Sequence, residues 1–350
     1  MQIIFTFSQI LLLGDSMHTI DLSKYSIRTD LIIETKDLNN YKTTTTKQDD
    51  ITIENTNSNN NKDKYTTISF NDVTDKTNFQ KVEQVFTNEL KKYLSNIELD
   101  QKDTVLVVGL GNSKSTPDSL GPNTIKNILV TSYLFELGEV EDAYQSVSAI
   151  SPSVTSITGI ETSRAIKSLV TTINAKLLIV IDALAASSLH RLNKTIQITN
   201  TGIHPGSGVG NNRKELSYNT LNIPVIAIGV PTVVDATTIV TDTFKYMQQQ
   251  FSYKINNQNN QKIKLIPESS QDYRDENNDL SINEKKEILG EVGILSEDEF
   301  KQLIYEVLSP INYNLMVTPT EIDFIIEKLG LLIGTGINKT LHKNFKTTNN

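Results

Sequence analysis

The chain contains no cysteine among its 350 residues. It can therefore hold no disulfide, no cysteine nucleophile and no thiolate-bound zinc or iron–sulfur cluster. Histidine is scarce as well, since the only four are His18, His190, His204 and His342. None of them has the H-E-x-x-H spacing that is typical of zinc peptidases. These absences exclude several common kinds of catalytic centre before any motif is considered.

Positive charge and long apolar runs are also in short supply. Lysine and arginine number 33 against 41 aspartate and glutamate, which gives a net charge of −8. A general nucleic-acid binder would usually be basic, so we expect no nucleic-acid partner. No apolar run has the length of about 20 residues that a membrane-spanning helix needs, so we expect no membrane association.

The apolar start of the chain, Met1–Leu13, resembles a secretory signal peptide only superficially. It lacks a basic n-region and a cleavage site of small residues. We therefore predict a cytoplasmic protein, and we expect Met17 to be the natural start of translation.

Two stretches of the chain are polar and low in sequence complexity, namely residues 39–64 and 256–283. Neither contains enough apolar surface to offset the conformational entropy that ordering would cost. We predict that both stretches are mobile insertions or loops.

Elsewhere, short apolar runs alternate with segments of helical periodicity. The strand-like runs are Thr104–Val108, Ser148–Ile150, Leu177–Ile181, Thr195–Ile198 and Pro224–Val230. The helical segments are Phe79–Leu94, Asn123–Leu137, Gly159–Ile173, Val233–Met247, Glu297–Leu308 and Thr320–Ile333. This alternation predicts an α/β domain with a mixed, largely parallel sheet that is flanked by helices.

Two aspartates lie where such a sheet would bind a ligand, at the carboxyl ends of its strands. Asp118 follows the first apolar run, and Asp182 closes the run Leu177–Ile181. Each also has an ordinary explanation, because Asp118 could cap a helix and Asp182 could form a turn. Two carboxylates in one crevice push their pKa values apart. One could then activate water while the other protonates a scissile amide, which makes the pair a candidate for peptide hydrolysis.

A glycine-rich segment, Gly202–Arg213, follows a further strand-like run. Backbone amides around Gly206 and Gly208 could form a nest for an anion or oxyanion, or the segment could be a plain tight loop. His204 could be a supporting hydrogen-bond partner, a metal ligand or an ordinary loop histidine. Arg213 could bind a substrate carboxylate or form a surface ion pair.

Asp235 is the reserve candidate for a catalytic carboxylate, although its place near a predicted helix start also suits the helix dipole. Sharper motifs are absent. A dinucleotide fingerprint would need glycine where Lys114 stands, and a nucleophile elbow would need glycine in place of Pro205. The residues alone thus indicate a hydrolase-like α/β protein with a candidate aspartate pair.

At these segments the sequence resembles the germination proteases of spore-forming bacteria. The matching segments are YSIRTDL (Tyr25–Leu31), VVGLGN and TPDSLGP (within Val107–Pro122), TGIETS (Thr158–Ser163), IDALAA (Ile181–Ala186), TGIHPGSGVGNNRKE (Thr201–Glu215), IPVIAIGVPTVVDA (Ile223–Ala236) and NLMVTPTEID (Asn314–Asp323). The resemblance runs from about Asp21 to His342 and implies a fold similar to that of hydrogenase maturation endopeptidases.

The resemblance also implies an activity. The family consists of atypical aspartic-type endopeptidases, and we expect no cofactor and no metal. They degrade small acid-soluble spore proteins early in germination, in the spore core. By motif, the two essential aspartates of the family fall on Asp118 and Asp182. Ser119 stands where the family commonly has alanine, which we expect to be tolerated.

The family is made as a zymogen that removes its own N-terminal segment. Its processing site resembles Arg28–Glu34, so we expect cleavage between Asp30 and Leu31. Residues 1–30 would then be an extension and propeptide, and residues 31–350 a single peptidase domain. The resemblance further implies a homotetramer.

Two other functions remain open at this point. A hydrogenase-maturation-type endopeptidase would share the architecture but sense nickel, with Asp118, Asp182 and His204 as conceivable ligands. A non-enzymatic binding protein would need neither aspartate.

Overall fold

The computed structural model describes residues 29–35, 38–138, 140, 143–204, 215–257, 280–308 and 315–345. These residues fall in two compact units. One unit, Arg28–Met247 together with Asn314–Asn350, contains the whole sheet and both aspartates of the candidate pair. The other includes Gln248–Tyr313 and is helical in its described part. The expected start at Met17 and most of the second low-complexity stretch, residues 258–279, lie outside the described residues.

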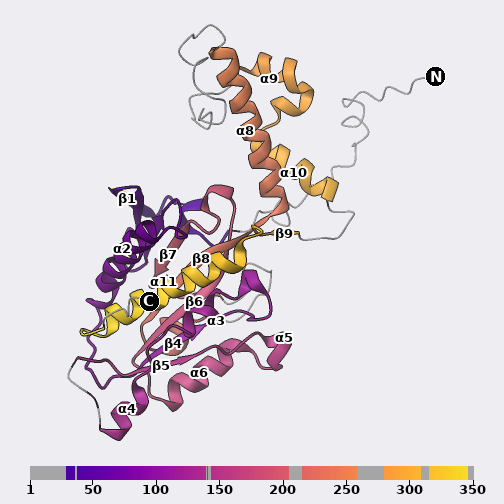
Figure 1. The fold of residues 1–350 in the computed structure, drawn as a ribbon. Helices are drawn as coiled ribbons and strands as arrows, with labels where there is room; N and C mark the ends of the chain where they lie inside the picture. The colour runs from indigo at the N-terminus through magenta and orange to yellow at the C-terminus, as the bar shows by residue number, and fades with distance from the viewer. Residues whose placement is uncertain are drawn as a thin grey trace. The chain divides into compact units, whose positions relative to one another are not determined.

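The sheet has nine strands. Figure 1 labels β1 and β4 to β9 among them. Their order is β1-β2-β3-β7-β8-β6-β4-β5, and β9 pairs with β8. The strands are β1 (Tyr41–Gln48), β2 (Ile51–Ser58), β3 (Lys64–Ser69), β4 (Val105–Gly109), β5 (Val147–Ile150), β6 (Leu177–Ala186), β7 (Thr195–Thr199), β8 (Val225–Asp235) and β9 (Met316–Val317).

One short helix of the described chain precedes the strands, and the others lie between and after them. They are η2 (Ile32–Glu34), α2 (Lys76–Leu94), η3 (Thr116–Asp118), α3 (Leu120–Ile125), α4 (Ser132–Leu137), α5 (Thr155–Thr158), α6 (Thr162–Thr172), η4 (Leu189–Arg191), α7 (Tyr218–Leu221), α8 (Ala236–Asn256), α9 (Ile282–Leu289), η8 (Gly290–Ile294), α10 (Glu297–Leu308) and α11 (Ile322–Leu341). Within the described part of the chain, no helix is both long and apolar enough to span a membrane.

One half of the sheet is parallel. Strands β5, β4, β6 and β8 run in the same direction, and the apolar runs of β4, β6 and β8 are buried on both faces. This burial explains why they read as continuous apolar stretches rather than as alternating ones. The α/β class and the mixed sheet are thereby confirmed.

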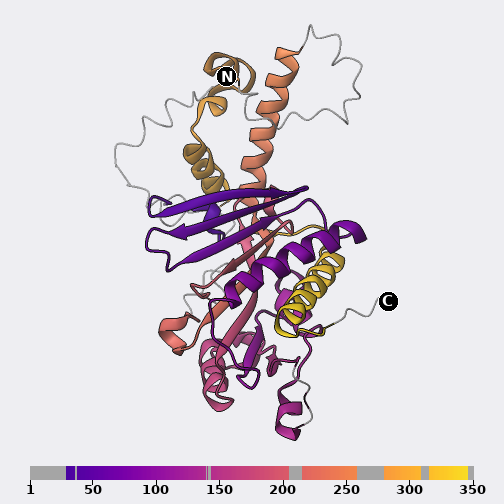
Figure 2. The same cartoon turned by 90° about the vertical axis from the view of Figure 1, so that its left-hand side faces the viewer.

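The two faces of the parallel half are covered by different helices. Ile179 and Ile181 of β6 share a core with Phe86 of α2 and with residues of α3 and α11. Leu178 and Val180 point the other way and pack with α6. Figure 2 shows α2 and α11 side by side on one side of the sheet, where they contact each other. Odd-numbered and even-numbered residues of β6 therefore face opposite layers.

The other half of the sheet is antiparallel and corrects one prediction. Residues 39–64, predicted as a loop, form the hairpin β1–β2 and lead into β3. Ile51 and Ile53 of β2 are buried, and the threonines of β1 are β-branched, which favours a strand. Asp49 adopts a left-handed φ of 55° in the turn. The loop prediction was wrong because alternation within a polar segment is easily mistaken for low complexity.

A second correction concerns the predicted helix Asn123–Leu137. The structure divides it into α3 and α4, with an interruption around Thr131. The Thr131 N–H donates to the carbonyl of Val147, and the Val147 N–H donates to Thr131 Oγ1 at 3.0 Å. These bonds to the edge strand β5 replace the bonds that a continuous helix would make.

Candidate active site

Asp182 lies inside β6 rather than at its end, because the strand continues to Ala186. In the register of the sheet it pairs with Gly229 of β8. Its side chain is 7% exposed, and Oδ1 accepts a hydrogen bond of 2.9 Å from the N–H of Ala183. A carboxylate is therefore held on the face of β6 that also carries Leu178 and Val180.

Asp118 is the last residue of η3, in the loop that follows β4. Its Oδ2 accepts a hydrogen bond of 3.0 Å from the N–H of Asn112, and its backbone carbonyl accepts one of 2.9 Å from the same group. Gly111 has a φ of +107°, and a Cβ there would lie 2.0 Å from the carbonyl oxygen of Asp118. The local fold thus requires glycine at 111 so that the chain can close around Asp118.

The helix-cap explanation of Asp118 does not hold in the structure. The N-cap of α3 is Ser119, and it makes no side-chain cap bond. The Asp118 carboxylate instead binds back to the loop that leaves β4. Its position is set by the strand end and not by the helix that follows.

Asp182 lies in β6, and Asp118 lies in the loop that follows β4, the parallel neighbour of β6. The N–H of Leu110 donates to the carbonyl of Ile181 at 2.8 Å, which extends the β4–β6 pairing and places Leu110 beside Asp182. Asn112, two residues further on, binds Asp118. η3 also packs against β6, β8 and α11. The arrangement agrees with the predicted pair, whose catalytic role stays a prediction.

A threonine fixes η3 to the other neighbour of β6. Thr232 Oγ1 donates a hydrogen bond of 2.7 Å to the carbonyl of Pro117, the residue before Asp118. Thr232 lies in β8, and its own carbonyl accepts a hydrogen bond of 2.8 Å from Thr318 Oγ1. Asp118 is thus held from two sides, by the end of β4 and by β8.

Asp235, the reserve candidate, has a structural task in this chain. It is the last residue of β8, and its Oδ1 accepts a hydrogen bond of 2.7 Å from the N–H of Thr237 in the first turn of α8. The prediction that it lies at a helix start is confirmed. A carboxylate at this position suits the dipole of α8.

The glycine-rich segment leaves the sheet at the opposite end from Asp182. β7 is antiparallel to β8, and Thr199 pairs with Ala227 near the start of β8. Because of this direction, β7 ends beside the amino-terminal end of β8, and sequence alone does not reveal the direction of β7. His204 is exposed. Gly206, Gly208 and Arg213 lie outside the described residues.

The alternative of a nickel site finds no support in the geometry. In the described ranges, no group of three or more His, Asp or Glu side chains could hold a metal ion. His204 and the two aspartates therefore do not form the cluster that a nickel-sensing endopeptidase would require.

The predicted processing segment lies directly beside β6. The N–H of Asp30 donates to the carbonyl of Ala185 at 3.1 Å, and the N–H of Ala185 donates to Asp30 Oδ2 at 2.8 Å. Leu31 is only 1% exposed and packs against Leu184, Ala186, Leu192 and Val234. The segment is bound three residues along β6 from Asp182.

Two side chains that the sequence analysis did not single out bind this segment. Gln197 of β7 contacts the backbone of Asp30 and Ile32. Arg191 forms an ion pair with Glu34, in which Nε lies 3.5 Å from Oε1. The other carboxylate oxygen of Glu34, Oε2, accepts a hydrogen bond of 2.7 Å from the N–H of Ser187. These partners are more than 150 positions apart in sequence, so no local pattern could have indicated them.

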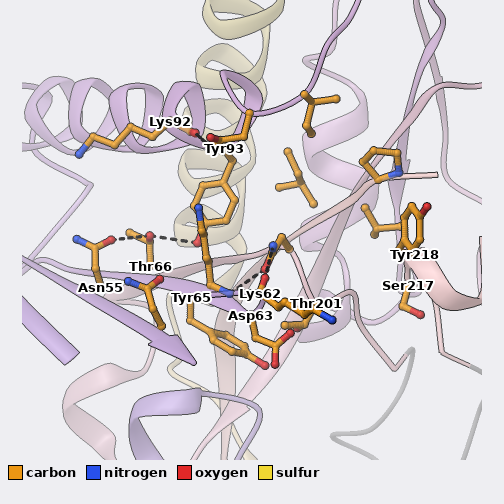
Figure 3. A pocket seen from close by; sticks show the side chains of 18 of the residues that line it. Asn55, Lys62, Asp63, Tyr65, Thr66, Lys92, Tyr93, Thr201, Ser217 and Tyr218 are labelled. Carbon is orange, nitrogen blue, oxygen red and sulfur yellow. Dashed lines mark hydrogen bonds between the residues drawn. The ribbon is translucent and has the colours of Figure 1, made fainter. Parts of the chain in front are cut away.

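A separate cavity of about 980 Å³ lies elsewhere in this unit, between α2, β3 and the start of β8. Figure 3 shows Asn55, Thr66 and Tyr93 joined by hydrogen bonds on its wall. The lining carries charges of both signs. The positive charges belong to Lys62, Lys64 and Lys92, and the negative charges to Asp63, Glu89 and Glu215. The cavity does not include Asp118 or Asp182.

Comparison with known proteins agrees with the resemblance. A family model described as germination protease matches residues 16–350. A germination protease of Bacillus cereus (strain B4264) is 46% identical over 286 residues, covering 77% of this chain and 75% of the relative. A germination protease of Bacillus subtilis (strain 168) is 40% identical over 358 residues, covering 94% of this chain and 97% of the relative. The chain therefore belongs to the germination protease family and is an endopeptidase of the aspartic type.

Proposed function

We propose that this endopeptidase degrades small acid-soluble spore proteins in the spore core during germination, with Asp118 and Asp182 as its catalytic carboxylates. The observation that supports the pair is its place in the parallel half of the sheet, where Asp182 lies within β6 and Asp118 lies in the loop that follows the neighbouring strand β4. One is anchored by Asn112 and the other is buried within the strand.

The chemistry that such a pair performs is hydrolysis without a covalent intermediate. One carboxylate takes a proton from water, and the water oxygen attacks the scissile carbonyl carbon. The other delivers a proton to the leaving nitrogen as the C–N bond breaks. A coupled pair titrates as a unit, so the two roles are properties of the pair rather than of either residue.

The chain is further proposed to be a homotetrameric zymogen that cuts itself between Asp30 and Leu31. The proposed cleavage site is supported by the position of Asp30, which is hydrogen-bonded to Ala185 of β6, three residues along the strand from Asp182. Processing would require the same carboxylates as substrate cleavage.

The decisive experiment compares three isosteric variants on a purified small acid-soluble spore protein. Asp118→Asn and Asp182→Asn should each lower turnover by about 100- to 10,000-fold, because neutral amides cannot accept or deliver the proton. Asp235→Asn is the matched control, since an asparagine can still cap α8 and turnover should remain near that of wild type.

Fragment patterns should be followed by mass spectrometry and the fold by circular dichroism. Full activity in either pair variant would remove that residue from the mechanism. Loss of activity only in Asp235→Asn would transfer the catalytic role to the reserve aspartate.

A further inference from the structure

The side chain of Gln197 in β7 is hydrogen-bonded to the backbone on both sides of Leu31. Its Nε2 donates a hydrogen bond of 3.0 Å to the carbonyl oxygen of Asp30, and its Oε1 accepts one of 2.8 Å from the N–H of Ile32. A single side-chain amide thus makes the pair of bonds that a neighbouring strand would make. Gln197 is 6% exposed, so these bonds are shielded from water.

The position of Gln197 in the sheet relates it to Asp182. Both residues pair with Gly229 of β8, Gln197 from β7 and Asp182 from β6. Residues in register on neighbouring strands project to the same face, so the two side chains stand on one face with a glycine between them. Their Cα atoms are separated by two strand spacings, roughly 10 Å in total.

The neighbours of these residues agree with that face. Ile196 and Ile198, on either side of Gln197, belong to the core under α2, as do Ile181 and Ala183 around Asp182. Gln197 and Asp182 therefore both point away from that core. This is the face on which Leu31 packs, against Leu184 and Ala186 of β6.

The Asp30 carbonyl is thus bound by an N–H donor, while the residue that follows it is locked in an apolar pocket. We propose that Gln197 positions the Asp30–Leu31 peptide bond for cleavage and stabilises the charge that forms on the Asp30 carbonyl oxygen. The inference rests on the proposed processing between Asp30 and Leu31.

The reaction step is ordinary hydrolysis and consumes one water. The water oxygen bonds to the Asp30 carbonyl carbon, and the carbonyl oxygen gains negative charge beside Gln197 Nε2. The bond to the Leu31 nitrogen then breaks, and that nitrogen takes the proton that the attacking water gave up to the carboxylate pair. A fixed donor at a developing oxyanion lowers the barrier because it needs no reorganisation during the reaction.

The test is Gln197→Glu in the full chain. A carboxylate keeps the size and the acceptor for the Ile32 N–H but loses the donor to Asp30. Conversion of the purified chain should be followed by intact mass and by sequencing of the new N-terminus. Loss of one such donor predicts processing about 100-fold slower than wild type at pH 8.

Gln145→Glu is the matched control. Gln145 also donates through Nε2 to backbone carbonyls, those of Asp100 and Asp103, but it does so away from this segment. It should process at the wild-type rate. Thermal unfolding and circular dichroism should show whether the Gln197→Glu variant folds. If it does not, Gln197→Met repeats the test, because methionine has a similar length and lacks both polar atoms.

A pH series separates positioning from a general structural role. A protonated glutamic acid carries an O–H donor, so the ratio of Gln197→Glu to wild-type rate should rise as pH is lowered.

Processing of both Gln197 variants within about threefold of wild type would overturn the inference while leaving the processing itself intact. If wild type is not cut at Asp30–Leu31, the proposed processing fails, and the role of Gln197 fails with it.

Discussion

Gly111 is the residue on which the position of Asp118 depends most directly. Its φ is +107°, and a side chain there would bring its Cβ within 2.0 Å of the Asp118 carbonyl oxygen, which leaves no room for one. Gly138 also has a positive φ, of +72°, but a Cβ there would meet nothing within 4 Å. Substituting the two glycines in turn therefore separates the effect of backbone strain, which both positions share, from the effect of contact with Asp118, which only Gly111 has.

We expect Gly111→Ala to lower the free energy of unfolding by about 1–3 kcal/mol more than Gly138→Ala, because overpacking adds to the strain that both share. Peptidase turnover should fall strongly in the first variant only, since Asp118 must move. Urea unfolding and a substrate-cleavage assay on the two variants would check this. Equal effects in both would show that Asp118 does not depend on Gly111.

At this scale the sequence could nominate some site residues and not others. Asp118 and Asp182 follow apolar runs and are recognisable from local pattern and family motif. Gln197 and Arg191 were missed, because their contacts with residues 30–34 depend on how β7 and the preceding turn pair across the sheet. Polar residues that act through long-range backbone contacts carry no local signal.

Among the secondary-structure elements, η3 is the one that brings the site together. The Asn112 bond anchors its end to β4, and the Thr232 bond anchors its middle to β8. Thr232 and Thr318 form a matched pair, because both hydroxyls donate to a backbone carbonyl but only that of Thr232 reaches η3.

Thr232→Val should lower kcat with little change in KM, since it leaves the Pro117 carbonyl unpaired and frees η3. The unsatisfied carbonyl should cost about 1–3 kcal/mol of unfolding free energy. Thr318→Val should cost a similar amount of stability but keep kcat. Steady-state kinetics and urea unfolding of both variants measure the two effects, and equal kcat values would contradict this role for Thr232.

The elements themselves were predictable where periodicity is strong. The segment Glu297–Leu308 was predicted as a helix with the bounds that α10 has. The hairpin at residues 41–58 was missed, and β6 and β8 run past the ends of their apolar runs. In each case pairing with a neighbouring strand, rather than local hydrophobicity, determines where the strand lies or ends.

On the scale of the whole molecule, the end of α11 connects the helical layer to the edge of the sheet through His342. This histidine is 1% exposed, and its Nδ1 accepts a hydrogen bond of 3.3 Å from the N–H of Gln145, next to β5. Burial lowers the pKa of His342 below its usual 6.5, with a backbone bond at Leu129 opposing the shift.

This pKa shift predicts a pH dependence of stability. Below 6.5 the unfolded chain binds a proton at His342 more readily than the folded chain, so stability rises with pH in this window. The contribution is complete above 6.5 and is lost as the pH falls towards the folded pKa. His342→Gln should reduce the loss of unfolding free energy between pH 8 and pH 5, as measured by urea unfolding. An unchanged slope would exclude His342 as its source.

The overall class could be predicted because alternating buried runs and helices permit few arrangements. The antiparallel half could not, since β3 joins β7 across a separation of about 130 residues and neither strand reveals its partner. The homotetramer and the domain boundaries stay predictions.

The burial of Leu31 has a consequence for the moment after processing. A cut after Asp30 turns the Leu31 amide into a charged ammonium group, at a residue that is only 1% exposed among Leu184, Ala186, Leu192 and Val234. Holding such a charge out of water costs on the order of several kcal/mol. The cut would thus change the new chain end from a well-bound peptide into a poorly tolerated ion. The charged chain end at Leu31 would therefore leave the apolar pocket after the cut. Its departure would make the cleavage difficult to reverse.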